Sequence, residues 1–265
     1  LEELPSVEVV RVPTEPFATL PERFERELQS GDYQLAYASQ VFFDSGVAFP
    51  GLLELAGRKP ESTEMVIDGY HAFFARPTDL GAIADKVFYT AGSYKYLGAG
   101  EGMCFMSIPR NCQLRPLNTG WFAEMAELEN RNEGVGFGND WLRFAGATMD
   151  YSPLYKALAV LELYAQEGIT VESIHTYVQQ NQRRFLAAMD VAQHPLLNRN
   201  NLIAHDLESG HGHFFTFRCG TAENAERLQA QLREKNVLCD RRQQLLRLGF
   251  ALYHPEDETF ARVFS

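Results

Sequence analysis

Short apolar runs alternate with amphipathic segments over residues 7–108. The β-branched run 7–13 ends in proline and predicts a strand, whereas residues 20–28 carry apolar side chains at helical spacing and predict a helix. The nearly continuous apolar run 34–43 predicts a strand buried on both faces. A further helix is predicted over 49–56, and further strands over 64–68, 86–90 and 103–108. This alternation predicts an α/β domain with a mostly parallel sheet and helices on both sides.

The second half of the chain follows a different pattern. Residues 111–142 are rich in Gly, Asn and scattered aromatics and predict a long irregular excursion, a kind of segment that is often functional. Apolar residues at helical spacing over 153–189, interrupted at Gly168, predict two helices. A strand over 213–218, a helix over 222–235 and a strand over 245–248 then predict a small α+β domain. We place the boundary near residue 180, so that 1–180 form the large domain and 181–265 the small one.

Composition and charge narrow the function classes. The chain has 35 acidic and 24 basic residues, and this excess of negative charge argues against binding to nucleic acid or to anionic membranes. No apolar run is long enough to cross a bilayer. The four cysteines form no C-x-x-C pair and have no histidine at zinc-finger spacing, which predicts free thiols, no metal site and a cytoplasmic location. The first residues lack both an initiating Met and a signal-peptide pattern, so we expect a part of a longer chain.

The most informative stretch for chemistry runs over residues 90–102. It places Lys95 between two tyrosines and follows it with three glycines. A lysine between two apolar strands is desolvated, which lowers the pKa of its amine and makes it a nucleophile for Schiff-base chemistry, and the glycines admit a bulky cofactor. The alternative is a lysine that extends into solvent from a tight turn, and spacing alone does not separate the two interpretations.

A carboxylate, Asp68, lies upstream of this stretch, at the carboxyl end of a predicted strand. Open α/β sheets bind ligands at those ends. A buried carboxylate there needs a cationic partner, and a protonated pyridine nitrogen is one candidate. The alternative for Asp68 is a cap on the next turn, and for His71 it is a hydrogen-bonded core residue.

Together these motifs resemble the class V group of fold-type I pyridoxal-phosphate (PLP) enzymes, and within it the kynureninases. The resemblance covers the chain from about Val7 to its last residue. The motifs are Asp68-x-x-His71, Pro77-Thr78-Asp79-Leu80, Ser93-Tyr94-Lys95-Tyr96-Leu97 with its Gly-x-Gly-x-Gly, Gly120-Trp121-Phe122, and Asp240-Arg241-Arg242 with the segment Arg247 to Tyr253.

The resemblance implies PLP as the cofactor and a homodimer with its active site at the subunit interface. Lys95 would hold the cofactor as a Schiff base, Asp68 would pair with the pyridine nitrogen, and His71 would lie beside the ring. The remaining cofactor-binding residues would be Ser93, Tyr94, Trp121 and Thr148, with the last three at the phosphate and Thr148 reaching it across the interface. Arg247 would bind the α-carboxylate of an amino-acid substrate.

The activity implied is hydrolytic Cβ–Cγ cleavage of kynurenine-type substrates. A class V aminotransferase or a related PLP lyase is the alternative within the fold. Cysteine desulfurase is disfavoured, since Cys239 lies against a predicted strand and not on a mobile loop, and we expect the other cysteines to be small core residues. From other classes, the chain could be an inactive module that serves dimerisation or regulation, or a Rossmann dehydrogenase, although its glycines lack the G-x-G-x-x-G order.

Overall fold

The computed structural model describes residues 3–127, 136–204, 207, 210–256 and 258–264. Its helices are α1 (Leu20–Ser30), α2 (Leu52–Gly57), α3 (Ser152–Gln166), α4 (Val171–Ala192), α5 (Ala222–Glu234) and α6 (Ala261–Phe264). Its strands are β1 (Leu35–Ser39), β2 (Glu64–Asp68), β3 (Phe88–Gly92), β4 (Cys104–Ser107), β5 (Phe214–Arg218), β6 (Asp240–Arg242) and β7 (Leu245–Gly249). Short 3₁₀ helices are η1 (Phe17–Thr19), η2 (Trp121–Glu127) and η3 (Trp141–Phe144).

A four-stranded sheet in the order β1-β2-β3-β4 forms the first layer. Strands β1, β2 and β3 are parallel, and β4 is antiparallel to β3. The register pairs Ser39 with Asp68 and Asp68 with Thr90, so the carboxyl ends of the parallel strands meet at one edge. The prediction of a mostly parallel α/β sheet is confirmed. α3 contacts the loop after β3, where its Ala157 packs with the buried Leu97.

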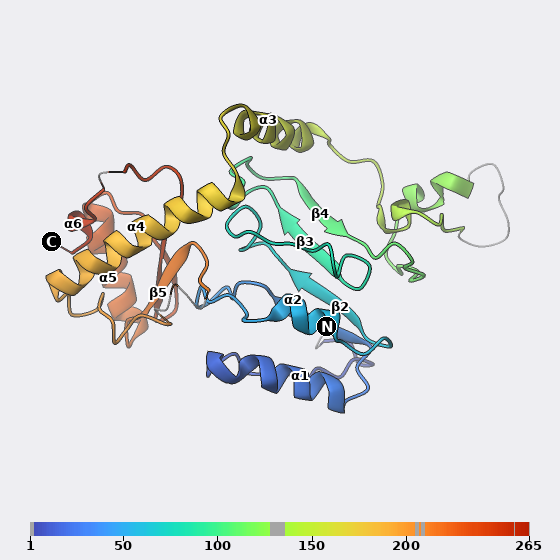
Figure 1. Cartoon of the computed structure of the whole chain (residues 1–265), viewed down its shortest axis with the longest axis horizontal. Helices are drawn as coiled ribbons and strands as arrows, with labels where there is room; N and C mark the ends of the chain where they lie inside the picture. The colour runs from blue at the N-terminus through green and yellow to red at the C-terminus, as the bar shows by residue number, and fades with distance from the viewer. Residues whose placement is uncertain (1–2, 128–135, 205–206, 208–209, 257, 265) are drawn as a thin grey trace.

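Burial of β1 on both faces is a wrong prediction. Its burial alternates, with Ala36 and Ala38 inside and Leu35 and Tyr37 45% and 57% exposed. The inner face belongs to a core shared with α1 and α2, which lie together beside the sheet in Figure 1. An apolar run predicts burial but cannot tell how many faces are covered.

The predicted strand over 7–13 is also wrong. These residues are largely exposed, and none lies in a strand. β-branched residues favour extended backbone, yet a strand also needs a hydrogen-bonded neighbour, and among the described residues none pairs with this run.

The C-terminal part forms an antiparallel sheet, β5-β7-β6, covered by helices. Its core centres on Phe185 of α4, whose ring contacts those of Phe215, Phe217, Phe250, Phe260 and Phe264. The predicted α+β layer is confirmed, and α4 contributes to its core from Val178 onward. The two helices separated at Gly168, which has φ +66°, are confirmed as α3 and α4. Because α4 continues unbroken through residue 180, the domain boundary there stays a prediction.

The predicted excursion over 111–142 contains η2 and part of η3 among its described residues, while 128–135 lie outside them. Figure 1 shows this green segment projecting away from the sheet. Leu117 is fully exposed and Trp141 is 67% exposed.

The two layers are joined between the loop after β1 and the segment before β5. Val47 forms an isolated bridge with His211, and the amide of Gly212 donates to the carbonyl of Gly46 at 2.7 Å. A Cβ on Gly212 would lie 2.7 Å from Val41, so this close approach requires glycine. The junction therefore brings the C-terminal layer to the carboxyl edge of the first sheet.

Candidate active site

Asp68 ends β2 at the carboxyl edge of the sheet. Its Oδ1 accepts the backbone N–H of Tyr70 at 2.9 Å, and its Oδ2 accepts the hydroxyl of Tyr37 at 2.8 Å. Burial and then the bond to Asp68 raise the pKa of Tyr37 to about 12. Asp68 thus caps the following turn, as the simpler interpretation expects. Among the described residues no cationic side chain forms an ion pair with it.

Lys95 and His71 lie side by side at the same edge. The Nζ of Lys95 is 2.8 Å from Nε2 of His71, and Lys95 is partly buried and does not extend freely into solvent. Burial lowers the pKa of His71 to about 4, and the charges of Lys95 and Arg247 add to this effect. Burial and then Arg247 also lower the pKa of Lys95. Both groups therefore favour their uncharged forms more than exposed ones would.

Arg247 reaches this site from β7, and its side chain is only 12% exposed. Its Nη1 donates to the carbonyl of Phe43 at 2.7 Å, and its guanidinium lies 4.1 Å from the centre of the Phe43 ring. Its Nε donates to Oδ2 of Asp240 at 2.9 Å, and its Nη2 donates to the same oxygen. Asp240 therefore occupies the Nε–Nη2 edge of the guanidinium and the carbonyl of Phe43 takes one N–H of Nη1, which leaves one N–H on each Nη for a ligand among the described contacts.

The loop that carries Lys95 is held by its own backbone. The fully buried Ser93 donates its hydroxyl to the carbonyl of Gly100 at 2.7 Å, so the proton of this predicted cofactor-binding group is engaged within the loop. Tyr94 is 44% exposed, with its ring centre 5.2 Å from Nζ of Lys95. Gly100 has φ +78° and no atom within 4 Å of an added Cβ, so backbone conformation and not crowding calls for glycine here.

Trp121 and Thr148 lie elsewhere. Trp121 begins η2 in the exposed 111–142 segment, and Thr148 is an exposed residue between η3 and α3. Trp121 is 48% exposed, and its described ring contact is with Phe122. No described contact joins either residue to Lys95, so the structure of one chain brings together Asp68, His71, Lys95 and Arg247 but not these two.

Sequence reasoning missed Tyr37, Phe43 and Tyr96 as neighbours of the site. The ring of Tyr96 contacts that of His71 at 6.4 Å between centroids, and the ring of Phe43 contacts it at 5.8 Å. Tyr96 was visible as the residue after the lysine, but Tyr37 and Phe43 have no local signal, because only the folded sheet brings them to this edge.

Comparison with known proteins identifies the fold. No protein-family model and no curated protein matches the sequence. Among solved structures, the cystine C–S lyase C-DES matches with a TM-score of 0.72 at 16% identity, over 92% of this chain and 63% of that one. A cysteine desulfurase from Thermococcus onnurineus has a TM-score of 0.71 at 15% identity, over 92% and 61%. An alanine–glyoxylate aminotransferase from Nostoc sp. has a TM-score of 0.62 at 14% identity, over 92% and 63%.

The chain has the fold of these enzymes. The predicted fold-type I architecture is thereby confirmed. The chain spans less than two thirds of the length of each of these three structures.

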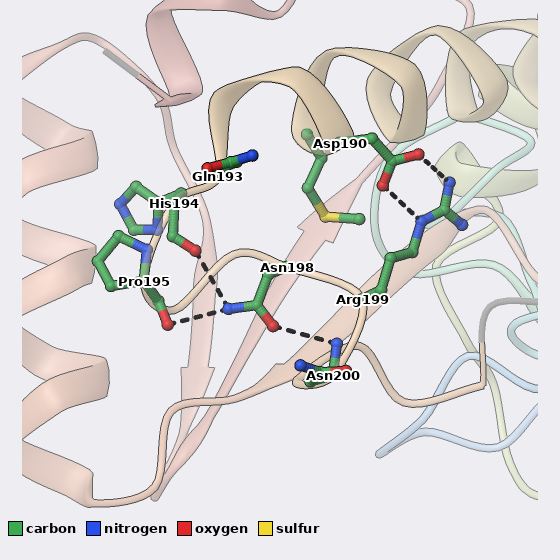
Figure 2. A pocket seen from close by; sticks show the side chains of 8 residues that line it. Asp190, Gln193, His194, Pro195, Asn198, Arg199 and Asn200 are labelled. Carbon is green, nitrogen blue, oxygen red and sulfur yellow. Dashed lines mark hydrogen bonds and ion pairs between the residues drawn. The ribbon is translucent and has the colours of Figure 1, made fainter.

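Other features of this PLP-enzyme fold are separate from the site. A surface hollow of about 370 Å³ lies at the end of α4 (Figure 2), where several polar side chains already bind one another or nearby backbone, as in the Asp190–Arg199 ion pair at 2.7 Å. The described residues contain no group of three or more metal-ligating side chains and no helix long and apolar enough to cross a membrane.

All four cysteines are free, as predicted, but Cys104 is exposed and is not the core residue we expected.

Proposed function

We propose that this chain is a PLP-dependent enzyme acting on an amino acid, with Lys95 as the residue that holds the cofactor. The observation that carries the proposal is the partly buried Lys95 amine, 2.8 Å from an uncharged imidazole at the ligand-binding edge of the sheet. A lysine with a lowered pKa is the nucleophile that Schiff-base formation requires.

The other side chains at this edge fit PLP. Asp68 has no cationic partner among the described residues, and the pyridine nitrogen would supply one. When bound, PLP would serve as an electron sink that acidifies the Cα–H of an amino acid. Lys95 is then the group that takes and returns protons, and Nε2 of the uncharged His71 can accept a hydrogen bond from its amine. Arg247 would orient the substrate carboxylate through the N–H groups that Asp240 and the carbonyl of Phe43 leave open.

For the reaction, we favour kynureninase-like hydrolytic cleavage, which rests on the resemblance around Gly120-Trp121-Phe122 and from Arg247 to Tyr253. A class V aminotransferase is the second candidate, supported by the aminotransferase among the similar structures. Desulfuration is less favoured because it needs a thiolate, and burial and Asp240 raise the pKa of Cys239 to about 11.

We also propose a homodimer in which Trp121 and Thr148 act on the partner's site. In support, both residues are exposed, and neither has a described contact with Lys95. Mixing a Lys95→Ala chain with a Trp121→Ala/Thr148→Ala chain under exchange conditions tests this. If each active site uses residues of both chains, the mixture regains activity. If each site is formed by one chain, the activity of the mixture equals the sum of the activities of the two variants.

The central experiment is borohydride reduction of the protein with PLP, followed by peptide mapping. We expect a visible absorbance that reduction abolishes and a label on Lys95. Lys95→Ala removes both, and Lys86→Ala, whose lysine donates to the carbonyl of Gly57, is the matched control that keeps them. Label on another lysine, or none, refutes the proposal, and a wild-type chain without absorbance favours the inactive module. Product analysis with kynurenine, 3-hydroxykynurenine, and alanine plus a keto acid then separates hydrolase from aminotransferase.

A further inference from the structure

Three rings form a row behind the Lys95–His71 pair, namely those of Tyr96, His213 and His175. Tyr96 meets His213 edge to face at 5.1 Å between centroids, and its other described ring contact is with His71 at 6.4 Å. His213 and His175 lie nearly parallel, with Nε2 of His213 3.1 Å from Nδ1 of His175. The row therefore runs from the residue next to Lys95 to α4.

The three rings come from three separate parts of the chain. Tyr96 belongs to the loop after β3, His213 immediately precedes β5, and His175 lies in α4. His213 is anchored by its own backbone, since its carbonyl accepts the N–H of Phe250 at 2.7 Å. The row is thus a side-chain connection between the lysine loop and the C-terminal layer.

The surroundings of the row disfavour a positive charge on the imidazoles of His213 and His175. His213 is fully buried, and its Nδ1 has no hydrogen-bond partner among the described residues. The guanidinium of Arg76 donates to the carbonyl of His211 at 2.7 Å and pairs with no carboxylate among the described residues. The charged or titratable groups that act on the row are Arg76, His211, Arg183 of α4, Arg247 of β7, Tyr253 and the neighbouring His71. Burial, together with His175, Arg76 and His211, lowers the pKa of His213 to about 3.

We propose that Tyr96, His213 and His175 are positioning residues for Lys95, and that their row holds the lysine loop against the C-terminal layer so that the amine stays beside His71 and away from water. An aromatic ring wedged between two uncharged imidazoles excludes water from one side of the loop. Loss of a ring admits water beside Lys95, and solvation then restores the preference of the amine for its charged form. The inference relies on the proposed function only in treating Lys95 as the reactive amine.

The test measures how readily Lys95 reacts with an amine-selective acylating reagent as a function of pH, mapped by mass spectrometry. It uses the full chain after hydroxylamine treatment and dialysis, so the readout does not depend on PLP. Only the uncharged amine reacts, so the midpoint reports the protonation of Lys95, with Lys59 and Lys86 as internal references. We expect the wild-type midpoint to lie below theirs. Tyr96→Ala and His213→Gln should raise it by about one pH unit, which makes labelling about tenfold slower at a fixed lower pH.

Matched variants separate positioning from general packing. Tyr96→Phe keeps the ring and should keep the wild-type midpoint. Gln182→Leu removes a buried hydrogen bond to the carbonyl of Gly212, beside the row but with no described ring contact, and should lower stability without moving the midpoint. Tyr164→Phe removes a tyrosine bond to Leu97 under the same loop and serves as a second control.

Each outcome decides the proposal. Unchanged midpoints in both Tyr96→Ala and His213→Gln overturn it, as does an equal shift in Gln182→Leu. A variant that fails to fold is replaced by the milder His175→Gln, whose unchanged midpoint also overturns it. A shifted midpoint in a chain that never binds PLP upholds the row and refutes the proposed function instead.

Discussion

The amine of Lys95 lies 2.8 Å from Nε2 of His71, and the pKa of each group is lowered from its ordinary value. Burial is the largest cause for both, and the charge of Arg247 acts on both in the same direction. Two bases in contact, with a cation from the other layer close by, disfavour two charges at once. The pair therefore favours a lysine that is uncharged, and so reactive, at a lower pH than an exposed one.

Asp68→Asn tests the carboxylate at the strand end. The amide keeps the size of the side chain but cannot stabilise a cation, so we expect partial cofactor retention and a loss of about 3 kcal/mol in activity, roughly 100-fold. Asp79→Asn, which alters a surface turn where Asp79 accepts the N–H of Gly81, is the control and should stay active. A wild-type rate in Asp68→Asn would rule out the proposed role.

Tyr37→Phe removes the hydroxyl that donates to Asp68. We expect the free energy of unfolding to fall by about 0.5–1.5 kcal/mol, the usual net value of one hydrogen bond, and activity to fall less than in Asp68→Asn. Urea unfolding and steady-state rates measure both quantities. Tyr33→Phe, which removes a similar tyrosine–carboxylate bond to Glu27, should change stability but not activity. An equal loss of activity in both variants would show that Tyr37 has no specific effect on the site.

Arg247→Lys separates geometry from charge, because lysine keeps the charge but loses the fork. We expect kcat/KM to fall by an amount equivalent to about 2–4 kcal/mol of transition-state stabilisation, with cofactor absorbance retained. Stability should fall as well, since Arg247 also binds Asp240 and the carbonyl of Phe43. The matched control is Arg242→Lys, which alters an exposed partner of the same Asp240 and should change either quantity by less than about 1 kcal/mol. Unchanged kcat/KM for every amino acid tried would remove Arg247 from the site.

Acid should destabilise the junction between the layers. Burial lowers the pKa of His211 to about 4 in the folded chain, against an unfolded value of about 6.5, so the unfolded state binds more protons below pH 6.5. The contribution of His211 to the free energy of unfolding is therefore complete above pH 6.5 and decreases as the pH drops toward 4. At pH 5 the loss from His211 alone is about 2 kcal/mol relative to neutral pH. Urea unfolding at several pH values should show a flatter acid dependence in His211→Gln. An identical pH dependence in this variant would contradict the assignment.

The pattern of apolar residues within one segment was sufficient to predict elements that this pattern itself determines. The predicted helix over 20–28 and strand over 64–68 correspond to α1 and β2, because amphipathic spacing and short apolar runs determine those elements directly. β6 was missed because its residues, Asp240, Arg241 and Arg242, are all charged. It is a strand only because β7 lies beside it, and such pairing leaves no trace in a short charged segment.

The residues of the candidate site also fall into two groups, those that the sequence predicted and those that only the folded structure brings together. Asp68, His71 and Lys95 follow neighbouring parallel strands, so the order of elements alone predicts that they meet. His213 and Tyr37 carried no such signal, since a lone histidine or tyrosine is compatible with many environments. Their contacts with Tyr96 and Asp68 depend on the folded arrangement of segments distant in sequence.

The bond from Arg247 to the carbonyl of Phe43 joins residues that are 204 positions apart. During synthesis, the loop after β1 therefore leaves the ribosome long before the strand that fixes it exists. Contacts of such long range slow folding, because the intervening chain must be ordered before they form. The loop around Phe43 is accordingly among the last parts of the protein to reach its final contacts, and a nascent chain that stops before β7 has the lysine but lacks the guanidinium that lowers its pKa.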